Sequence, residues 1–127
     1  MIHGIGTDIV KIERIAAIYE RHGERLARHI LMDEELAAFR EDRRPARFIA
    51  MRFAAKEAIV KAMGTGFAEG MWLRDAGVVK DSKGRPEVIW SQRGRERRDQ
   101  LGIGMAHLTL SDDSGLVVAV AVLMRVG

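Results

Sequence analysis

The sequence has 127 residues, 47% of them hydrophobic and 31% charged, a composition typical of one globular domain over residues 1–127 with a single modest core. It contains no cysteine, which excludes disulfides, thiolate metal sites and cysteine nucleophiles and is compatible with a reduced, cytoplasmic setting. The formal charge is only +3, no apolar run approaches the ~20 residues of a membrane span, and the start shows no basic and apolar leader, so we expect neither a membrane segment nor a signal peptide.

The first thirty residues predict a strand and two helical segments. Residues 2–10 form a short, mostly apolar strand pattern. An amphipathic helix is predicted over 11–22, with apolar residues recurring every third or fourth position. Gly23 breaks this helix, because glycine is a poor helix former, and a shorter helical segment follows over 24–30.

The next segments predict a short helix and then the longest helix of the chain. Asp33 is predicted to cap a helix over 34–42, whose acidic first turn suits the helix dipole. Pro45 marks a boundary, because proline is tolerated at the start of a helix and not inside it. The long helix is predicted over 46–63 and ends at the glycines of residues 64–66, since glycine readily adopts the left-handed conformation.

The second half of the chain predicts four strands and one polar helix. These are strands over 76–80 and 87–90 around a hairpin loop, a helix over 91–101, and strands over 106–111 and 116–123. The last strand pattern is continuously apolar, which predicts a central strand covered on both faces. The predicted fold class is therefore α+β, with an antiparallel sheet packed on one long buried helix.

The long predicted helix is apolar on nearly every side, yet it carries Glu57 and Lys61 one turn apart. Burying such charges costs desolvation energy, which indicates that a charged group binds there. The alternative is a common surface pair worth about 0.2–0.5 kcal/mol. Asp8 supplies a second carboxylate that interrupts the apolar pattern of the first strand and needs a partner. Two hard oxygen ligands beside a lysine suit Mg²⁺ and a phosphorylated substrate, so we predict a magnesium site at Asp8 and Glu57.

Two motifs make this sequence similar to a known family. They are Gly4-Ile-Gly-Thr-Asp8-Ile-Val near the start and, in the middle, Arg52-Phe-Ala-Ala-Lys-Glu57 followed by Lys61-Ala-Met-Gly64-Thr-Gly66. The sequence resembles the bacterial holo-[acyl-carrier-protein] synthases, the small single-domain type of 4′-phosphopantetheinyl transferase. The resemblance extends to Gly84-Arg-Pro86 and to His107-Leu-Thr-Leu-Ser111-Asp112, so it covers essentially the whole chain.

This resemblance implies an activity and its catalytic residues. Members of the family move 4′-phosphopantetheine from coenzyme A to a serine of apo acyl carrier protein and release adenosine 3′,5′-bisphosphate. By the match, Asp8 and Glu57 hold Mg²⁺ and Lys61 contacts phosphate, so these three are the predicted catalytic residues. The proton acceptor is left between Glu57, or a water that it orients, and Asp112. The family also implies a homotrimer with the adenine pocket between subunits.

The resemblance further implies the contacts with coenzyme A. The predicted residues are Arg43, Arg44, Arg52, Lys61, Gly64, Gly84, Arg85, Pro86, His107 and Thr109. For His107 the alternative is a hydrogen-bonded histidine of the core or of an interface. The sequence departs from the family pattern at Arg85, where the family has lysine, and at residues 116–117, where it commonly has an aromatic-alanine pair.

Basic residues in the first two helical segments predict a docking face for acyl carrier protein. A 4-3-4-3 spacing places five side chains along one helical face: Arg14, Ile18, Arg21, Arg25 and Arg28. Acyl carrier proteins are small and acidic, so basic groups around one apolar side chain would steer and seat them. The alternative is a solvated face whose continuity Gly23 interrupts. Family members use the first helix for this contact, which favours docking.

Two other classes of protein are compatible with parts of the sequence. A nucleic-acid-binding module would suit the isoelectric point near 9.7, but the aromatic content of 6% provides few stacking groups. A Mg²⁺-dependent pyrophosphate hydrolase would use the same two carboxylates with water as the nucleophile. The resemblance favours coenzyme A, apo acyl carrier protein and Mg²⁺ as the binding partners, with no nucleic acid and no membrane.

Overall fold

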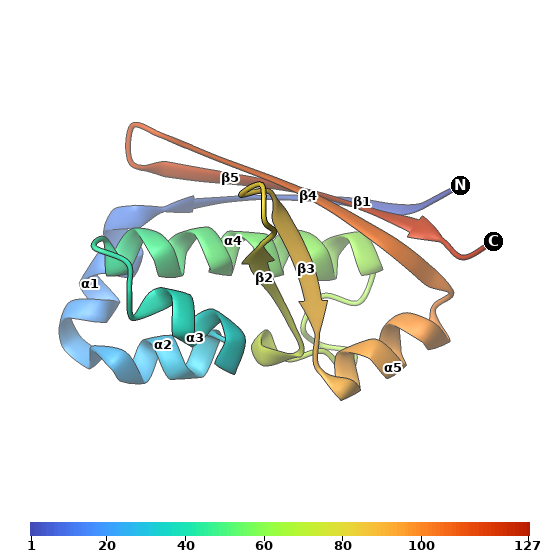
Figure 1. Cartoon of the computed structure of the whole chain (residues 1–127), viewed down its shortest axis with the longest axis horizontal. Coiled ribbons are helices and arrows are strands. Elements are labelled where there is room, and N and C mark those ends of the chain that lie inside the picture. The colour runs from blue at the N-terminus through green and yellow to red at the C-terminus, as the bar shows by residue number, and fades with distance from the viewer.

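The computed structural model describes residues 1–127 and confirms the predicted α+β class. In chain order the elements are β1 Ile2–Lys11, α1 Ile12–His22, α2 Glu24–Ile30, α3 Asp33–Phe39, α4 Pro45–Met63, the 3₁₀ helix η1 Leu73–Asp75, β2 Ala76–Lys80, β3 Pro86–Trp90, α5 Gln92–Gln100, β4 Ile103–Asp113 and β5 Leu116–Arg125. Helix α4 runs through the middle of the molecule, with the three long strands on one side and the remaining elements on the other (Figure 1). The two termini lie at the same end.

The long strands form one antiparallel sheet in the order β1-β5-β4, and this sheet packs on α4 as predicted. Strands β2 and β3 form a second, two-stranded antiparallel sheet. The β2–β3 hairpin crosses the direction of the larger sheet steeply (Figure 1), so its strands cannot join the same backbone ladder. This hairpin lies beside α4, and the two elements together line a cavity.

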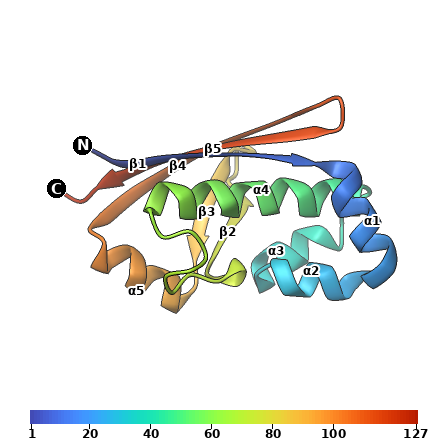
Figure 2. The ribbon, with the colours of Figure 1, turned by 180° about the vertical axis from the view of Figure 1, so that it is seen from behind.

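Strand β5 is central, as predicted, but it is covered on one face only. Its alternate residues Val117, Ala119, Ala121 and Leu123 are buried against α4. On the opposite face Ile5 is 59%, Ile9 65% and Val118 38% exposed. No element of the chain lies on that face in either view (Figures 1 and 2). The prediction that both faces of β5 are covered is therefore wrong within one chain, because α4 and all the remaining elements lie on the same side of the sheet (Figures 1 and 2).

Helix α4 is buried from almost every direction, which explains its apolar sequence. Twelve of its 19 residues are buried. The helix begins with Pro45 at its first position, one residue earlier than predicted, and Gly64 follows its last residue with φ 84° in the left-handed region. None of the helices combines the length and the apolar surface that crossing a bilayer requires.

Strand β1 approaches α4 so closely that two of its residues must be glycine. A Cβ atom built on Gly6 would lie 2.0 Å from the carbonyl oxygen of Ala58, and one on Gly4 would lie 2.0 Å from that of Ala62. Both clashes are with helix backbone, which cannot rotate away as a side chain does. The spacing between β1 and α4 therefore depends on the absence of side chains at these two positions.

Helix α3 differs from the prediction at both ends. Asp33 is its first residue rather than its cap, because Glu35 accepts a 2.9 Å hydrogen bond from the backbone N–H of Met32. The helix ends at Phe39 and not at residue 42. The Asp42 carboxylate instead accepts a 2.8 Å hydrogen bond from the N–H of Arg44, which stabilises a turn before α4.

Candidate active site

Asp8 and Lys61 meet where β1 runs along α4 (Figure 1). Asp8 lies near the end of β1, opposite Ala119 of β5. The Lys61 ammonium donates to the Asp8 Oδ1 atom at 3.1 Å and to the carbonyl oxygen of Thr7 at 3.0 Å. The Asp8 side chain is 15% exposed and that of Lys61 is 49% exposed. The pair therefore lies at a solvent-accessible edge, where a charged ligand can reach it.

Glu57 lies one helical turn before Lys61 and is partly buried. Burial raises its pKa above the ordinary glutamate value, the charge of Asp8 raises it further, and the Lys61 ammonium opposes both. The carboxylate of Asp8 therefore lies near enough to Glu57 for its charge to act on that residue. Both also line a cleft of about 460 Å³ between β1, α1, α2 and α4. The structure thus brings together the three predicted catalytic residues.

The donor atoms of this cleft fit a magnesium ion. Two carboxylates that repel each other gain from a shared dication, which relieves the repulsion. No third acidic or histidine side chain joins them into a cluster of three. Mg²⁺ tolerates this, because it commonly takes one or two carboxylates and fills its other positions with water and phosphate oxygens. Asp8 and Glu57 could therefore hold the ion while leaving room for a pyrophosphate.

A second cavity, of about 300 Å³, contains four of the residues predicted to bind coenzyme A. Its lining includes Arg52 of α4, Gly84 and Pro86 of the hairpin, and Thr109 of β4. It contains none of the three catalytic candidates. Within one chain, the predicted nucleotide residues and the predicted metal ligands therefore border different cavities.

Arg52 is buried to 5% exposure, yet part of its guanidinium remains available. Its Nε atom donates to the carbonyl oxygen of Val78 at 3.1 Å, and the group packs 4.3 Å from the ring centre of Phe48. The two terminal nitrogens make no hydrogen bond within the chain, and no side-chain nitrogen is both enclosed and unpaired. These nitrogens therefore keep some exposed surface, and Arg52 lines the second cavity as well as a neighbouring groove bordered by Glu34 and Glu41. They are available to a phosphate.

The other predicted coenzyme A residues border neither cavity. Arg43 and Arg44 are exposed before α4, Gly64 follows the end of that helix, and Arg85 pairs with Asp81 at 3.2 Å. His107 is exposed on β4, so the alternative of a core histidine is wrong, while that of an interface histidine stays open. The roles of these residues stay predictions.

Arg47 and Asp112 form a two-pronged ion pair at the rim of the second cavity. Arg47 donates from Nε and Nη2 to the two Asp112 oxygens, each at 2.8 Å. This contact ties the last residues of β4 to the start of α4. It also places Asp112, the second candidate for proton acceptor, away from the cleft of Asp8 and Glu57 in the same chain.

This ion pair predicts a pH-dependent contribution to stability. The hydrogen bond from Arg47 holds the pKa of Asp112 below its ordinary value of 3.8. Because the folded-state pKa of Asp112 is lowered, the stabilisation by this ion pair is complete above the unfolded-state pKa. It is lost as the pH falls through the folded-state pKa. We expect Asp112→Asn to cost about 0.5–1 kcal/mol of unfolding free energy at pH 7, with the difference from wild type shrinking in acid. Thermal unfolding followed by circular dichroism from pH 7 to about pH 3 measures it. A difference independent of pH would contradict this origin.

The predicted docking residues lie on two helices rather than on one continuous face. Gly23 has φ 57° and separates α1 from α2. Arg14 and Ile18 line the same cleft as Asp8 and Glu57, whereas Arg25 and Arg28 line an adjacent groove of about 500 Å³. Arg21 is exposed on α1 and lines neither. Arg14 and Ile18 thus border the candidate active site, Arg28 also lines a cavity that reaches Glu57, and the single predicted stripe is interrupted.

Sequence reasoning missed an apolar cavity of about 780 Å³ that also reaches Glu57. Its apolar lining consists of Phe53, Phe67, Met71, Trp72 and Leu73. Three of these residues lie in the segment between α4 and η1, which carries no periodic pattern. The aromatic residues at 67 and 72 in an otherwise glycine-rich stretch were the only available signal.

Sequence reasoning also missed a buried ion pair between Glu35 of α3 and Lys56 of α4. The Lys56 Nζ atom lies 2.7 Å from the Glu35 Oε1 atom, and both side chains are 0% exposed. Lys56 is the neighbour of Glu57 and occurs within the motif quoted above. Nothing in the pattern of α3 indicates that Glu35 points inward, because it follows Asp33 and Glu34 in an acidic first turn.

Comparison of the sequence with known proteins finds relatives over nearly the whole chain. The model of the 4′-phosphopantetheinyl transferase superfamily matches residues 4–121. A holo-[acyl-carrier-protein] synthase from Halorhodospira halophila is 49% identical over 124 residues, which cover 98% of each chain. One from Azoarcus sp. is 49% identical over 123 residues, covering 97% of this chain and 98% of the relative.

Solved structures show the same fold. The holo-[acyl-carrier-protein] synthase of Neisseria meningitidis superposes with a TM-score of 0.93 at 38% identity, covering 98% of this chain and 100% of that one. The Helicobacter pylori synthase in complex with coenzyme A gives 0.82 at 29% identity, covering 94% and 98%. The chain belongs to the 4′-phosphopantetheinyl transferase superfamily. Within it the chain groups with the holo-[acyl-carrier-protein] synthases, and it is an enzyme of that class.

Proposed function

We propose that this chain transfers the 4′-phosphopantetheine group of coenzyme A to a serine of apo acyl carrier protein, with Mg²⁺ as cofactor and adenosine 3′,5′-bisphosphate as the second product. The observation that carries the proposal is the meeting of Asp8 and Glu57 at one cleft, with Lys61 hydrogen-bonded to Asp8. The complexes of related synthases from Helicobacter pylori and Bacillus anthracis with coenzyme A support the choice of donor.

Asp8, Glu57 and Lys61 each have a distinct task in this reaction. Asp8 and Glu57 would hold Mg²⁺, which neutralises charge on the pyrophosphate oxygens when it is bound. Lys61 offers a compact positive charge to the same phosphates. The serine oxygen forms a bond to the β-phosphorus, and the bond from that phosphorus to the oxygen bridging to the α-phosphate breaks. The serine proton passes to Glu57, or to a water that Glu57 orients, and its raised pKa suits that role.

The two cavities that reach Glu57 accommodate the two substrates. The apolar cavity of about 780 Å³ suits the uncharged pantetheine arm. The cleft with Arg14 and Ile18 on its rim suits an acidic protein that brings its serine to Glu57. This arrangement favours transfer to a protein over hydrolysis by water, although a pyrophosphate hydrolase would use the same carboxylates.

The active form is proposed to be a homotrimer. The open face of the larger sheet is apolar, with Ile5, Ile9 and Val118 exposed, and such a patch favours association with another chain. The predicted nucleotide residues border a cavity separate from the metal ligands. A second copy could therefore place its Arg52 cavity next to the Glu57 cleft of the first. Light scattering coupled to size-exclusion chromatography measures the assembly.

Intact-mass spectrometry of apo acyl carrier protein tests the proposed function. Incubation with coenzyme A, Mg²⁺ and this enzyme should add one phosphopantetheine to the carrier protein. Omission of the carrier protein separates the two candidate activities, because a hydrolase would still consume coenzyme A. Consumption of coenzyme A without modification of any carrier protein would replace the transferase proposal by the hydrolase.

Charge reversal on α1 tests the docking face. Arg14→Glu together with Arg21→Glu should raise the KM for acyl carrier protein by about 10-fold or more, because opposite charges steer this encounter. The KM for coenzyme A should change by less than about twofold. Arg95→Glu is the matched control, because Arg95 is exposed on α5 and lines neither cavity that reaches Glu57. Equal changes in both KM values would show that α1 does not select the carrier protein.

A further inference from the structure

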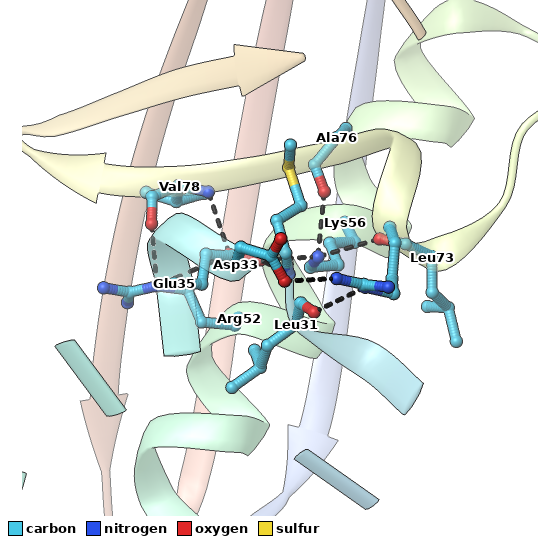
Figure 3. Close-up of polar contacts among 10 residues, drawn as sticks. Leu31, Asp33, Glu35, Arg52, Lys56, Leu73, Ala76 and Val78 are labelled. Carbon is cyan, nitrogen blue, oxygen red and sulfur yellow. Dashed lines mark hydrogen bonds and ion pairs between the residues drawn. The ribbon is translucent and has the colours of Figure 1, made fainter. Parts of the chain in front are cut away.

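The interior of the molecule contains a fully enclosed ion pair that the proposed chemistry does not use. Glu35 and Lys56 lie 2.7 Å apart, and neither side chain has any exposed surface (Figure 3). Isolated pairs of this kind contribute little net stability, because desolvation cancels most of their attraction. Replacing them by apolar groups is often neutral or stabilising. The contacts of the pair show what else it does.

Lys56 holds the segment between α4 and the hairpin. Its ammonium has three N–H donors, and all three find acceptors: Glu35 Oε1 and the carbonyl oxygens of Leu73 and Ala76, the latter two at 2.8 Å. Leu73 belongs to η1 and Ala76 begins β2. A single side chain of α4 therefore fixes the position at which β2 starts.

Glu35 fixes the same strand two residues further on. Its Oε2 atom accepts a 2.9 Å hydrogen bond from the N–H of Val78, and its Oε1 atom accepts another from Met32. The strand passes so close that a Cβ atom on Gly77 would lie 2.8 Å from the Glu35 carboxyl carbon. The carboxylate therefore occupies a site shaped around it, with both oxygens satisfied by hydrogen bonds.

Arg52 completes the network and connects it to the nucleotide cavity. Its Nε atom lies 3.7 Å from Glu35 Oε2 and donates to the carbonyl oxygen of Val78. Val78 thus binds Glu35 through its N–H and Arg52 through its carbonyl (Figure 3). Arg52 lines the cavity of Gly84 and Pro86, and its two unpaired terminal nitrogens are not enclosed. The direction of the guanidinium is therefore set by the buried pair and by the strand that the pair holds.

We propose that Glu35 and Lys56 are positioning residues that aim the Arg52 guanidinium, and the β2 wall beside it, at a phosphate group of coenzyme A. This inference rests on the proposed function, because coenzyme A is its ligand. A guanidinium fixed at Nε offers two parallel N–H donors to a phosphate without having to be ordered on binding. Neither Glu35 nor Lys56 touches the substrate.

Calorimetric titration with coenzyme A tests this positioning role without depending on catalysis. The Glu35→Gln/Lys56→Met double variant removes both buried charges together and keeps approximate side-chain shape. We expect its Kd for coenzyme A to rise by about 10-fold, within the range found when supporting residues around a site are lost. Its kcat at saturating coenzyme A and its KM for acyl carrier protein should stay within about threefold of wild type. Glu34→Gln, an exposed change on the same helix, is the control.

A double-mutant cycle with Arg52→Lys separates positioning from general destabilisation. Lysine carries all its donors on one nitrogen, so it cannot bond Val78 and also present the two parallel donors of a guanidinium to a phosphate, and Arg52→Lys should weaken coenzyme A binding by itself. Adding the double change to Arg52→Lys should then weaken binding by less than about twofold further, because both act through the same contact. Glu35→Asp, which keeps the charges but shortens the carboxylate, should raise the Kd in the same direction and serves if the double variant does not fold.

The outcomes are distinguishable. Unchanged coenzyme A affinity in the double variant and in Glu35→Asp would overturn the positioning role and leave the proposed function standing. Fully additive losses with Arg52→Lys would overturn it as well. Failure of the wild-type enzyme to bind coenzyme A at all would overturn both the inference and the proposed function.

Discussion

Replacement of Glu57 by glutamine is expected to lower phosphopantetheine transfer by roughly 100-fold or more at saturating substrates. Loss of a residue that merely supports a metal ligand costs about 10–100-fold, so loss of a direct ligand should cost at least as much. Glutamine keeps the shape of the side chain and removes its negative charge. Only one carboxylate, Asp8, then remains in the cleft. The measurement is kcat by intact mass or by product release, over a range of Mg²⁺ concentrations.

The combination with Asp8→Asn sharpens this test. If the two carboxylates act on one ion, the double variant should be scarcely worse than either single variant, because groups that act as a unit give non-additive losses. Glu41→Gln is the control, since Glu41 is exposed and makes no side-chain hydrogen bond. Glu57→Gln with near wild-type kcat at ordinary Mg²⁺ concentrations would show that this carboxylate is not needed for transfer.

Gly6→Ala is expected to damage the active site without touching any reacting group. The added Cβ would lie 2.0 Å from the carbonyl oxygen of Ala58 and 2.7 Å from the nitrogen of Ala62. Since both obstacles are backbone of α4, β1 must move away from the helix, and Asp8 two residues later must move with it. Overpacking of this kind costs about 1–3 kcal/mol of unfolding free energy. Displacing a ligand by about 1 Å can lower activity by about 100-fold.

Gly104→Ala is the matched control for this steric argument. Gly104 also lies in a strand of the larger sheet, but its added Cβ would make only ordinary van der Waals contacts with Val126, the nearest at 3.4 Å from the side chain. We expect this variant to unfold within a few degrees of wild type and to keep its activity. Thermal unfolding and the kcat of both variants decide the matter. Full activity in Gly6→Ala would show that the contact between β1 and α4 does not determine where Asp8 lies.

Much of the fold follows from local chemistry along the sequence. Pro45 and Gly64 predict the ends of α4 because each acts through its own backbone preference. The turn glycines and alternating apolar residues predict all five strands within a few residues. The number of covered faces of β5 could not be predicted in this way. Its sequence pattern shows that both faces are apolar, but it does not show whether another element covers each of them.

The chemistry of the site is also largely readable from residue types. An acidic side chain in an apolar strand and another in an apolar helix predict that Asp8 and Glu57 share a ligand. The raised pKa of Glu57, to which Asp8 contributes, agrees with that prediction. Charge in an apolar pattern is a signal that needs no knowledge of the partner.

The sequence by itself therefore determined the elements, the identities of the reactive groups and the family of the enzyme. Only the tertiary structure decided that Glu35 turns inward to meet Lys56, that Arg52 is held at one end and free at the other, and that Gly6 lies against Ala58. The physical reason is that a buried ion pair and a steric contact are properties of two residues far apart in the chain. Neither residue alone carries a pattern that names its partner.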